Sequence, residues 1–214
     1  ALLRAEGVDL TGVAVDPALP TGVALIAVSR EGENQIVVAP GANLGLTPDR
    51  VPDLGDAALI VQLELPVETV ERAVAAHAGL VCANLAPALP VSDALLTRAD
   101  LVVVNETEAA AYGARLGLCR GAVVTTLGAR GARMTRAGRE VAAAAPPPVT
   151  PVDTTGAGDC FVAALVVALL EGRDDEQALA FACAAGALAT TRPGAQTALP
   201  HREDVDEALV RALA

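Results

Sequence analysis

The run of residues from 153 to 170 combines small, acidic and apolar side chains in an order suited to phosphate chemistry. It begins Asp-Thr-Thr-Gly-Ala-Gly-Asp over 153–159 and continues with apolar residues over 161–170. Gly156 and Gly158 lack a Cβ, so the backbone N–H groups beside them can approach a ligand closely. The first turn of a helix leaves such groups unpaired and partly positive, which suits a phosphate. Asp159 would then take a proton from a hydroxyl that lies beside that phosphate.

An ordinary capped helix start is the alternative interpretation of the same residues. Asp159 is then a first-turn acid that the helix dipole favours. The apolar run over 161–170 predicts a buried helix in either case. The end that carries Asp159 is therefore expected to be held rigidly.

The elements that position this helix alternate between apolar strands and helices. Predicted strands cover 57–63, 80–84, 101–104 and 122–126, and predicted helices cover 66–78, a short segment capped by Ser92, 106–116, 159–171, 174–190 and 202–213. Strands that are apolar throughout and separated by helices indicate an α/β fold, with a doubly wound, mostly parallel sheet covered by helices on both faces. Ligands in such folds bind beyond the carboxyl ends of the strands.

The residues before this region show strand signals instead of helix signals. Val13–Val15 is predicted as a short strand, and the apolar runs 21–28 and 34–38 flank Glu31-Gly32-Glu33 as a β-hairpin. We therefore expect a partial β lid over 13–43 and an α/β nucleotide-binding and catalytic core over 44–214.

Two further local signals belong to that core. Thr47-Pro48 is typical of a helix start, with proline at the first helical position. An arginine-rich hairpin is predicted around 133–139, and the segment 142–148 is expected to be extended and to lead into the turn at Asp153.

Three of the predicted strands end in polar or glycine-rich segments, and each segment has an ordinary structural explanation. Glu64 could be a solvated strand end. The segment 105–108, Asn-Glu-Thr-Glu, could be a helix cap with first-turn acids. Gly128 and Gly131 could be turn glycines.

Composition excludes several classes of protein. The formal net charge is −11, which disfavours nucleic acid and anionic membranes as partners. The chain has no lysine, and this excludes a Walker A loop and the protein-kinase motif set. No signal peptide or long uncharged apolar span is evident. The four cysteines are scattered, so we expect reduced thiols and a cytoplasmic protein.

The run 153–161, Asp-Thr-Thr-Gly-Ala-Gly-Asp-Cys-Phe, closely resembles the C-terminal signature of the ribokinase-like (PfkB) carbohydrate kinases. The resemblance implies that Asp159 is the catalytic base and that Gly156, Ala157 and Gly158 form the anion hole. It extends to Asn-Glu-Thr-Glu at 105–108, to the turn Thr-Leu-Gly-Ala-Arg-Gly at 126–131, and to Gln-Leu-Glu at 62–64. The residues it implies for ATP binding are Asn105, Thr126, Leu127, Gly128, Ala129, Arg130, Gly131, Gly158, Asp159 and Cys183.

The resemblance also implies two cations. Glu108 would hold Mg²⁺ through water. A monovalent cation, K⁺, would lie between the Asp153 segment and the loop 191–196, which is Thr-Arg-Pro-Gly-Ala-Gln. Its implied ligands are Asp153, Thr155, Ala189, Arg192 and Gly194, with Ala198 where the family usually has a serine.

The activity implied is ATP-dependent phosphorylation of a pentose, D-ribose at its 5-hydroxyl, with Glu64 and Asp159 contacting the sugar. A kinase of another sugar, a sugar phosphate or a nucleoside is an alternative, and so is a non-catalytic nucleotide-binding protein. A Rossmann dehydrogenase is poorly supported, because no G-x-G-x-x-G follows the first strand. The family's small β sheet also implies a homodimer formed through the lid.

Besides Ala198, the likeness departs from the family at two further places. Asn84-Leu85-Ala86-Pro87 stands where the family has Asn-Pro-Ala-Pro, and the family's sugar-gripping N-terminal motifs are absent from this sequence. We therefore expect weak or no sugar kinase activity from this chain alone.

Overall fold

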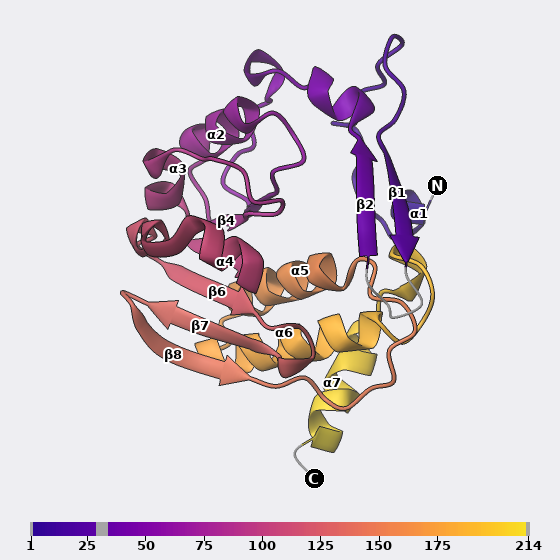
Figure 1. The fold of residues 1–214 in the computed structure, drawn as a ribbon, viewed down its shortest axis with the longest axis vertical. Coiled ribbons are helices and arrows are strands. Elements are labelled where there is room, and N and C mark those ends of the chain that lie inside the picture. The colour runs from indigo at the N-terminus through magenta and orange to yellow at the C-terminus, as the bar shows by residue number, and fades with distance from the viewer. Residues whose placement is uncertain (1, 29–33, 213–214) are drawn as a thin grey trace.

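The computed structural model describes residues 2–28 and 34–212, and its main feature is a six-stranded sheet (Figure 1). The strands are β3 (Leu59–Val61), β4 (Val81–Asn84), β5 (Leu101–Asn105), β6 (Ala122–Thr126), β7 (Ala132–Arg136) and β8 (Arg139–Ala144), and they lie in this order across the sheet. Neighbours from β3 to β6 are parallel, whereas β7 and β8 are antiparallel additions at one edge. The sheet is therefore mostly parallel, as predicted, and the arginine-rich hairpin is β7–β8.

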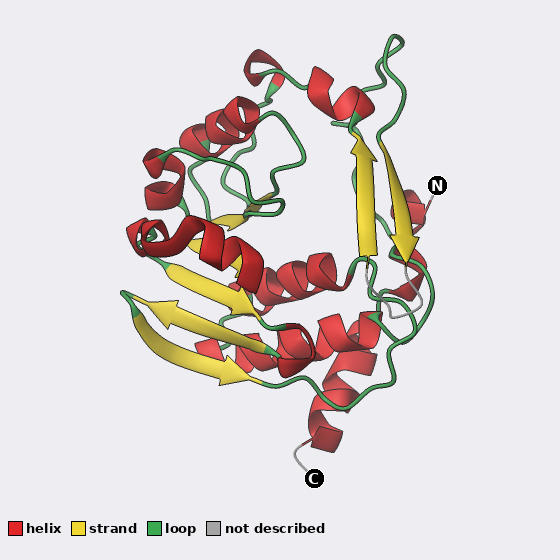
Figure 2. Ribbon diagram, in the orientation of Figure 1, coloured by secondary structure: helices red, strands yellow, loops and turns green. Residues whose placement is uncertain are grey.

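Helices cover both faces of this sheet (Figure 2). The α-helices are α1 (Leu2–Ala5), α2 (Val67–Ala76), α3 (Asp93–Arg98), α4 (Glu106–Tyr112), α5 (Ala157–Leu170), α6 (Asp175–Ala189) and α7 (Arg202–Ala212). Successive strand residues point to opposite faces, so β5 serves two cores. Leu101 and Val103 pack with the buried residues of α5 and α6, whereas Val102 and Val104 pack with those of α2 and α3.

Small side chains let α5 and α6 pack closely. Most buried positions of α6 are alanine or glycine. A Cβ added to Gly186 would lie 3.2 Å from the carbonyl oxygen of Ala157 and 3.3 Å from the Cβ of Phe161. Gly186 therefore allows the first turn of α5 to rest directly on α6, which fixes that turn in place.

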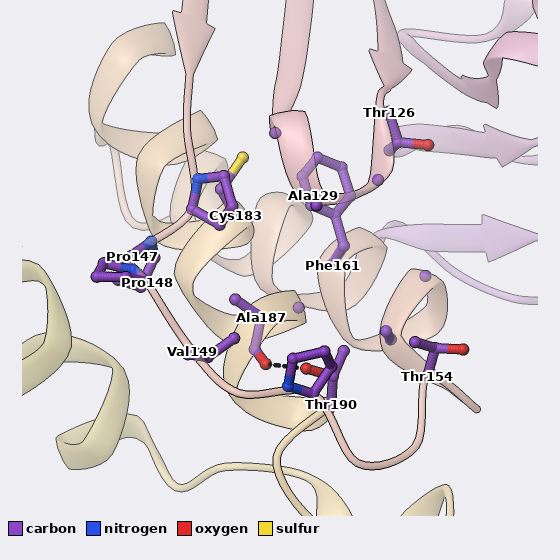
Figure 3. A pocket seen from close by; sticks show the side chains of 17 residues that line it. Thr126, Ala129, Pro147, Pro148, Val149, Thr154, Phe161, Cys183, Ala187 and Thr190 are labelled. Carbon is purple, nitrogen blue, oxygen red and sulfur yellow. Dashed lines mark hydrogen bonds between the residues drawn. The ribbon is translucent and has the colours of Figure 1, made fainter. Parts of the chain in front are cut away.

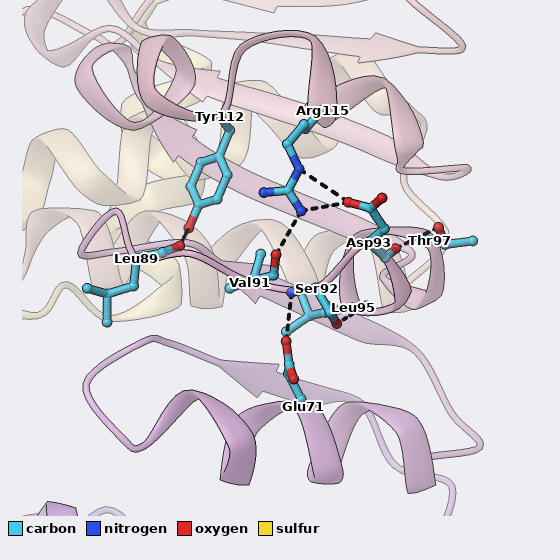
Figure 4. Close-up of polar contacts among 9 residues, drawn as sticks. All are labelled: Glu71, Leu89, Val91, Ser92, Asp93, Leu95, Thr97, Tyr112 and Arg115. Atoms are coloured by element: carbon cyan, nitrogen blue, oxygen red, sulfur yellow. Dashed lines mark hydrogen bonds and ion pairs between the residues drawn. The ribbon is translucent and has the colours of Figure 1, made fainter.

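On the face of the sheet away from α5 and α6, polar contacts join the helices to one another (Figure 4). Arg115 donates to the carboxylate of Asp93 at 2.6 Å and to the carbonyl oxygen of Val91 at 2.7 Å. The backbone N–H of Ser92 donates to Glu71 at 2.7 Å, and the side chain of Ser92 caps α3 as predicted. These bonds join α2, α3 and the segment after α4.

A separate two-stranded sheet lies beside this core (Figure 1). It consists of β1 (Val23–Val28) and β2 (Asn34–Ala39), which pair antiparallel with Leu25 opposite Val37. The two strands confirm the predicted hairpin, but the turn expected at 31–33 lies outside the described residues. The division into a lid over 13–43 and a core over 44–214 stays a prediction.

Three local predictions were wrong, each for a physical reason. Val13 and Val15 form no strand and are 65% and 90% exposed, because no described segment pairs with them. Thr47 precedes a three-residue 3₁₀ turn, Pro48–Arg50, since Pro52 disfavours helical backbone at the residue before it. The helix expected to run to residue 116 ends as an α-helix at Tyr112, where Gly113 adopts φ +53°.

The remaining short turns are 3₁₀ helices. They are η1 (Gly41–Gly45), η2 (Pro48–Arg50), η3 (Gly113–Leu118), η4 (Gly128–Arg130) and η5 (Gln196–Ala198). Two of them, η4 and η5, lie at loops where nucleotide and cation contacts are predicted. No helix in the described part of the chain is long and apolar enough to span a bilayer.

Candidate active site

The first turn of α5 presents two backbone N–H groups that have no acceptor among the described residues. Gly156 caps the helix in the left-handed conformation, with φ 77° and ψ 0°. The N–H of Ala157 donates to Thr154 and that of Cys160 to Gly156. Among the described residues, no acceptor pairs with the N–H of Gly158 or Asp159. Two adjacent donors at the positive end of a long helix are therefore free to bind an anion.

Asp159 stands beside these donors with one oxygen engaged. Its side chain is exposed, and its Oδ1 accepts a hydrogen bond from Nε2 of Gln62 at 2.6 Å. Gln62 follows β3 directly, so this contact joins the carboxyl end of the sheet to the start of α5. No described residue is hydrogen-bonded to the other oxygen, Oδ2, which can accept a proton from a substrate.

A pocket of about 470 Å³ opens beside the same helix turn (Figure 3). It brings together six of the residues predicted to bind nucleotide, which are Thr126, Gly128, Ala129, Gly131, Gly158 and Cys183. The opposite wall is apolar and was not predicted as part of a site; it consists of Pro146, Pro147, Pro148, Val149 and Pro151. Phe161 of α5 and Gly186 of α6 also line the pocket. The pocket therefore suits a flat, largely apolar group joined to an anion at the α5 end.

Cys183 takes part in this pocket as a thiol. Its Sγ lies 3.5 Å from the carbonyl oxygen of Ala144, and burial raises its pKa to about 11. The side chain is therefore neutral at physiological pH and contributes shape rather than charge.

The other residues predicted for nucleotide lie around the pocket without lining it. The N–H of Leu127 donates to the carbonyl oxygen of Gly131 at 2.7 Å and closes the turn. One guanidinium nitrogen of Arg130, Nη2, donates to both carboxylate oxygens of Glu106, at 2.6 Å and 2.7 Å, and so joins this turn to the start of α4. This pair is exposed, so we expect it to add little stability.

Asn105 and Glu108 form a capping box at the start of α4. The N–H of Glu108 donates to Oδ1 of Asn105 at 2.9 Å, and the N–H of Asn105 donates to Oε2 of Glu108 at 2.7 Å. The helix-cap interpretation is thus correct for both side chains. Burial raises the pKa of Glu108, and the bond from Asn105 opposes that rise in part.

Glu108 nevertheless retains an oxygen that can serve a metal. Its Oε1 accepts no hydrogen bond from a described residue. An oxygen ligand at one carboxylate fits Mg²⁺, which keeps most of its own waters when it is bound with phosphates. In the described part of the chain, no three His, Cys, Asp or Glu side chains form a metal-binding group.

Asp153 joins the two segments predicted to hold a monovalent cation. Its Oδ2 accepts from the N–H of Gly194 at 2.8 Å and its Oδ1 from the N–H of Thr155 at 2.9 Å. The bond from Gly194 is the main reason that the pKa of Asp153 is lowered. Each carboxylate oxygen has a second lone pair, and nearby backbone carbonyls are hard oxygen donors, so the donor set fits K⁺.

The remaining predicted residues lie at either end of these segments. Ala189 ends α6, Arg192 is exposed in the loop, and Ala198 is buried in η5. Glu64, the predicted sugar contact, is exposed in the turn between β3 and α2, two residues after Gln62. It lies at the carboxyl end of β3, and no hydrogen bond joins it to another described side chain.

Comparison with known proteins identifies chains that are similar to this one in sequence and in fold. The model of the pfkB family carbohydrate kinases matches residues 1–202. A ribokinase from Haemophilus influenzae is 36% identical, over 97% of this chain and 75% of its own length. The ribokinase structure from Thermotoga maritima matches with a TM-score of 0.79 and 33% identity, over 90% of this chain and 70% of that one. An Arabidopsis thaliana ribokinase complexed with ribose and ATP matches with a TM-score of 0.71 and 27% identity, over 90% and 70%.

Proposed function

Because the chain belongs to the pfkB family of carbohydrate kinases, we propose that it transfers the γ-phosphoryl group of ATP to the 5-hydroxyl of D-ribose. Family membership makes it a phosphotransferase with an alcohol group as acceptor. The observation that carries the proposal is the first turn of α5, where two free N–H groups and Asp159 lie beside a pocket of nucleotide size. The choice of ribose follows the ribokinases that the chain resembles.

The reaction proceeds by attack of the sugar hydroxyl oxygen on the γ-phosphorus. The bond from that phosphorus to the β–γ bridging oxygen breaks, ADP leaves, and the hydroxyl proton passes to Oδ2 of Asp159. The N–H groups of Gly158 and Asp159 stabilise charge on the transferring group. A carboxylate is a sufficient base, because the loose transition state releases the proton late.

The predicted cations fit this arrangement. Glu108 would hold Mg²⁺ through water, and the ion would neutralise charge on the ATP phosphates when bound. The carbonyl oxygens of Ala189, Arg192 and Gly194, with Asp153 and Thr155, would hold K⁺ behind the α5 turn. The cation would keep the loop and the turn in register, since Asp153 already bonds to both.

Two further parts of the proposal concern the protein's cellular location and its association with a second copy. All four cysteines are free thiols, which favours the reducing cytoplasm. The hairpin β1–β2 exposes apolar side chains that include Leu25 and Val37, each 68% exposed. We infer that two copies associate through this hairpin.

A panel of acceptors tests the activity. ADP formation is measured with ATP and ribose, 2-deoxyribose, fructose, ribose 5-phosphate or adenosine, and phosphorus NMR of the product identifies the esterified oxygen. We expect ribose to have the highest kcat/KM, at a low absolute rate because the family's sugar-gripping N-terminal motifs are absent from this sequence, and the product to be the 5-phosphate. A higher kcat/KM with adenosine or with a sugar phosphate would show that ribose is not the preferred acceptor, and the proposed substrate would then change. Binding of an ATP analogue without turnover of any acceptor would overturn the assignment as an enzyme.

A further inference from the structure

We propose that Gln62 is a positioning residue for the catalytic base, one that holds Oδ1 of Asp159 so that Oδ2 faces the acceptor hydroxyl. The inference rests on the proposed function, because it assigns Gln62 a part in the same proton transfer. Gln62 and Asp159 are 97 residues apart in the chain, and their side chains meet at 2.6 Å. This hydrogen bond links the strand end that carries Glu64 to the helix turn that binds phosphate.

The backbone of Gln62 is held on both sides. Val61 pairs with Ala83 in the parallel sheet. Leu63 donates its N–H to the carbonyl oxygen of Ala86 at 2.9 Å, and its side chain is 2% exposed. The amide of Gln62 therefore projects from a fixed point, and a fixed donor can select one orientation of its partner.

Asp159 needs such a partner because its side chain is exposed. An exposed carboxylate on the first turn of a helix can rotate among several conformers, and each unproductive conformer lowers the fraction of competent enzyme. Holding one oxygen leaves the other with a defined direction. Misplacement of a reacting group by about 1 Å can cost roughly 100-fold in rate.

The chemistry of glutamine suits this role. Its NH₂ group donates to a carboxylate but neither gains nor loses a proton, so it does not compete for the proton of the sugar hydroxyl. An arginine or lysine would donate as well, but its positive charge would make the carboxylate a weaker base. A neutral donor therefore orients the carboxylate of Asp159 and lowers the basicity of that carboxylate less than a cation would.

Two substitutions separate positioning from space filling. Gln62→Ala removes the donor, and Gln62→Glu keeps the shape but places a second carboxylate against Asp159. We expect kcat to fall by roughly 10- to 100-fold in Gln62→Ala and further in Gln62→Glu. The KM for ATP should stay within about twofold, because Gln62 does not line the nucleotide pocket. Gln177→Ala is the control, since Gln177 is exposed and its side chain makes no hydrogen bond within the described chain.

A thermal-unfolding cycle tests the contact without turnover. Gln62→Glu should lower Tm when residue 159 is aspartate. In the Asp159→Asn background the new glutamate gains a neutral partner, so most of this loss should disappear. Additive changes in Tm would show that the two side chains do not interact in solution and would overturn the inference.

The kinetic outcomes distinguish this inference from the proposed function. Suppose that Asp159→Asn is inactive. A wild-type kcat in both Gln62 variants, or a higher kcat in Gln62→Glu than in Gln62→Ala, would then overturn the positioning role of Gln62 and leave the proposed function intact. Full activity of Asp159→Asn would instead overturn the assignment of the base.

Discussion

Gly156 and Gly158 are separated by one residue at the start of α5, and their surroundings differ. Gly156 has φ +77°, and a Cβ there would lie 3.2 Å from the Cβ of Ala195. A Cβ on Gly158 would meet nothing within 4 Å, and Gly158 lines the pocket. Gly156 is therefore required by the fold of the turn, whereas Gly158 leaves room for a ligand.

Alanine substitutions should separate these two requirements. Gly156→Ala should destabilise the protein by about 1–2 kcal/mol, because an L-residue is strained in the left-handed region. Gly158→Ala should leave stability unchanged or raise it by up to about 1 kcal/mol, while it weakens ATP binding by filling the anion site. Urea unfolding and calorimetry with a non-hydrolysable ATP analogue measure both effects. Tight analogue binding by Gly158→Ala would show that the phosphates lie elsewhere.

Glu108 combines a buried position with a predicted metal contact. Burial raises its pKa above the ordinary value of 4.5, so the folded protein holds the proton more tightly than the unfolded chain does. Below pH 4.5 the carboxyl group is protonated in both the folded and the unfolded chain, so its burial carries no penalty for a charge. The penalty grows as pH rises above 4.5 and is complete above the raised pKa. A buried carboxyl group with a raised pKa is typical of a functional site as well as of a structural one.

Glu108→Gln should therefore be at least as stable as the wild type at pH 7, since glutamine also completes a capping box. The advantage should shrink towards pH 4, where Glu108 is protonated. We also expect the Mg²⁺ concentration that gives half of the maximal rate to rise by roughly 10- to 100-fold. Urea unfolding at both pH values and Mg²⁺ titration of the rate supply the measurements. Lower stability combined with unchanged Mg²⁺ dependence would leave Glu108 with the capping role alone.

At the scale of elements, two neighbours hold the start of α5, namely helix α6 and the loop 191–196. Asp153 makes the second connection through Gly194 and Thr155. Its pKa is lowered from 3.8, so this anchor persists above that pH and is lost only as pH falls through the lowered pKa. A cation bound here would therefore respond little to pH in the neutral range.

Replacement of Na⁺ by K⁺ at constant ionic strength should raise kcat, because the loop has no lysine whose ammonium could replace the cation. The response should be similar at pH 6 and pH 8, where Asp153 is ionised. Asp153→Asn should reduce it. Equal rates in the two salts for the wild-type protein would count against the site.

Much of this arrangement is predictable from sequence because its signals are local. The glycine turn before α5, the apolar strands and the cap at Ser92 each depend on a few neighbouring residues. The contact of Gln62 with Asp159 is not predictable in this way, because a neutral side chain 97 residues away carries no pattern. The end of α4 at Gly113 was also missed, since glycine tolerates helical and non-helical backbone alike. The segment 142–148 was expected to be extended and to lead into the turn at Asp153, but its role as a wall of the pocket was not predicted, because prolines carry no local signal for a ligand.

At the scale of the whole molecule, the hairpin β1–β2 exposes apolar side chains to solvent. Leu25 and Val37 lie opposite each other in the register and therefore share one face. An exposed apolar face on a two-stranded sheet favours association with a second copy.

Leu25→Glu should shift the protein from dimer to monomer in sedimentation velocity runs, because association would then bury a charge. Val210→Glu is the matched control, since Val210 is an apolar residue of α7 that is 67% exposed. A monomeric wild type, or a dimer that survives Leu25→Glu, would show that the hairpin is not the interface.

The central claim is that Asp159 is the base of a phosphoryl transfer that occurs at the start of α5. The most direct test compares the kcat of the wild type and Asp159→Asn with ATP and ribose, together with binding of an ATP analogue. Asp174→Asn is the control, because asparagine caps the start of α6 as well as aspartate does. The account predicts a loss of kcat on the order of 10²-fold or more in Asp159→Asn, with analogue binding retained. A near wild-type kcat in that variant would contradict it.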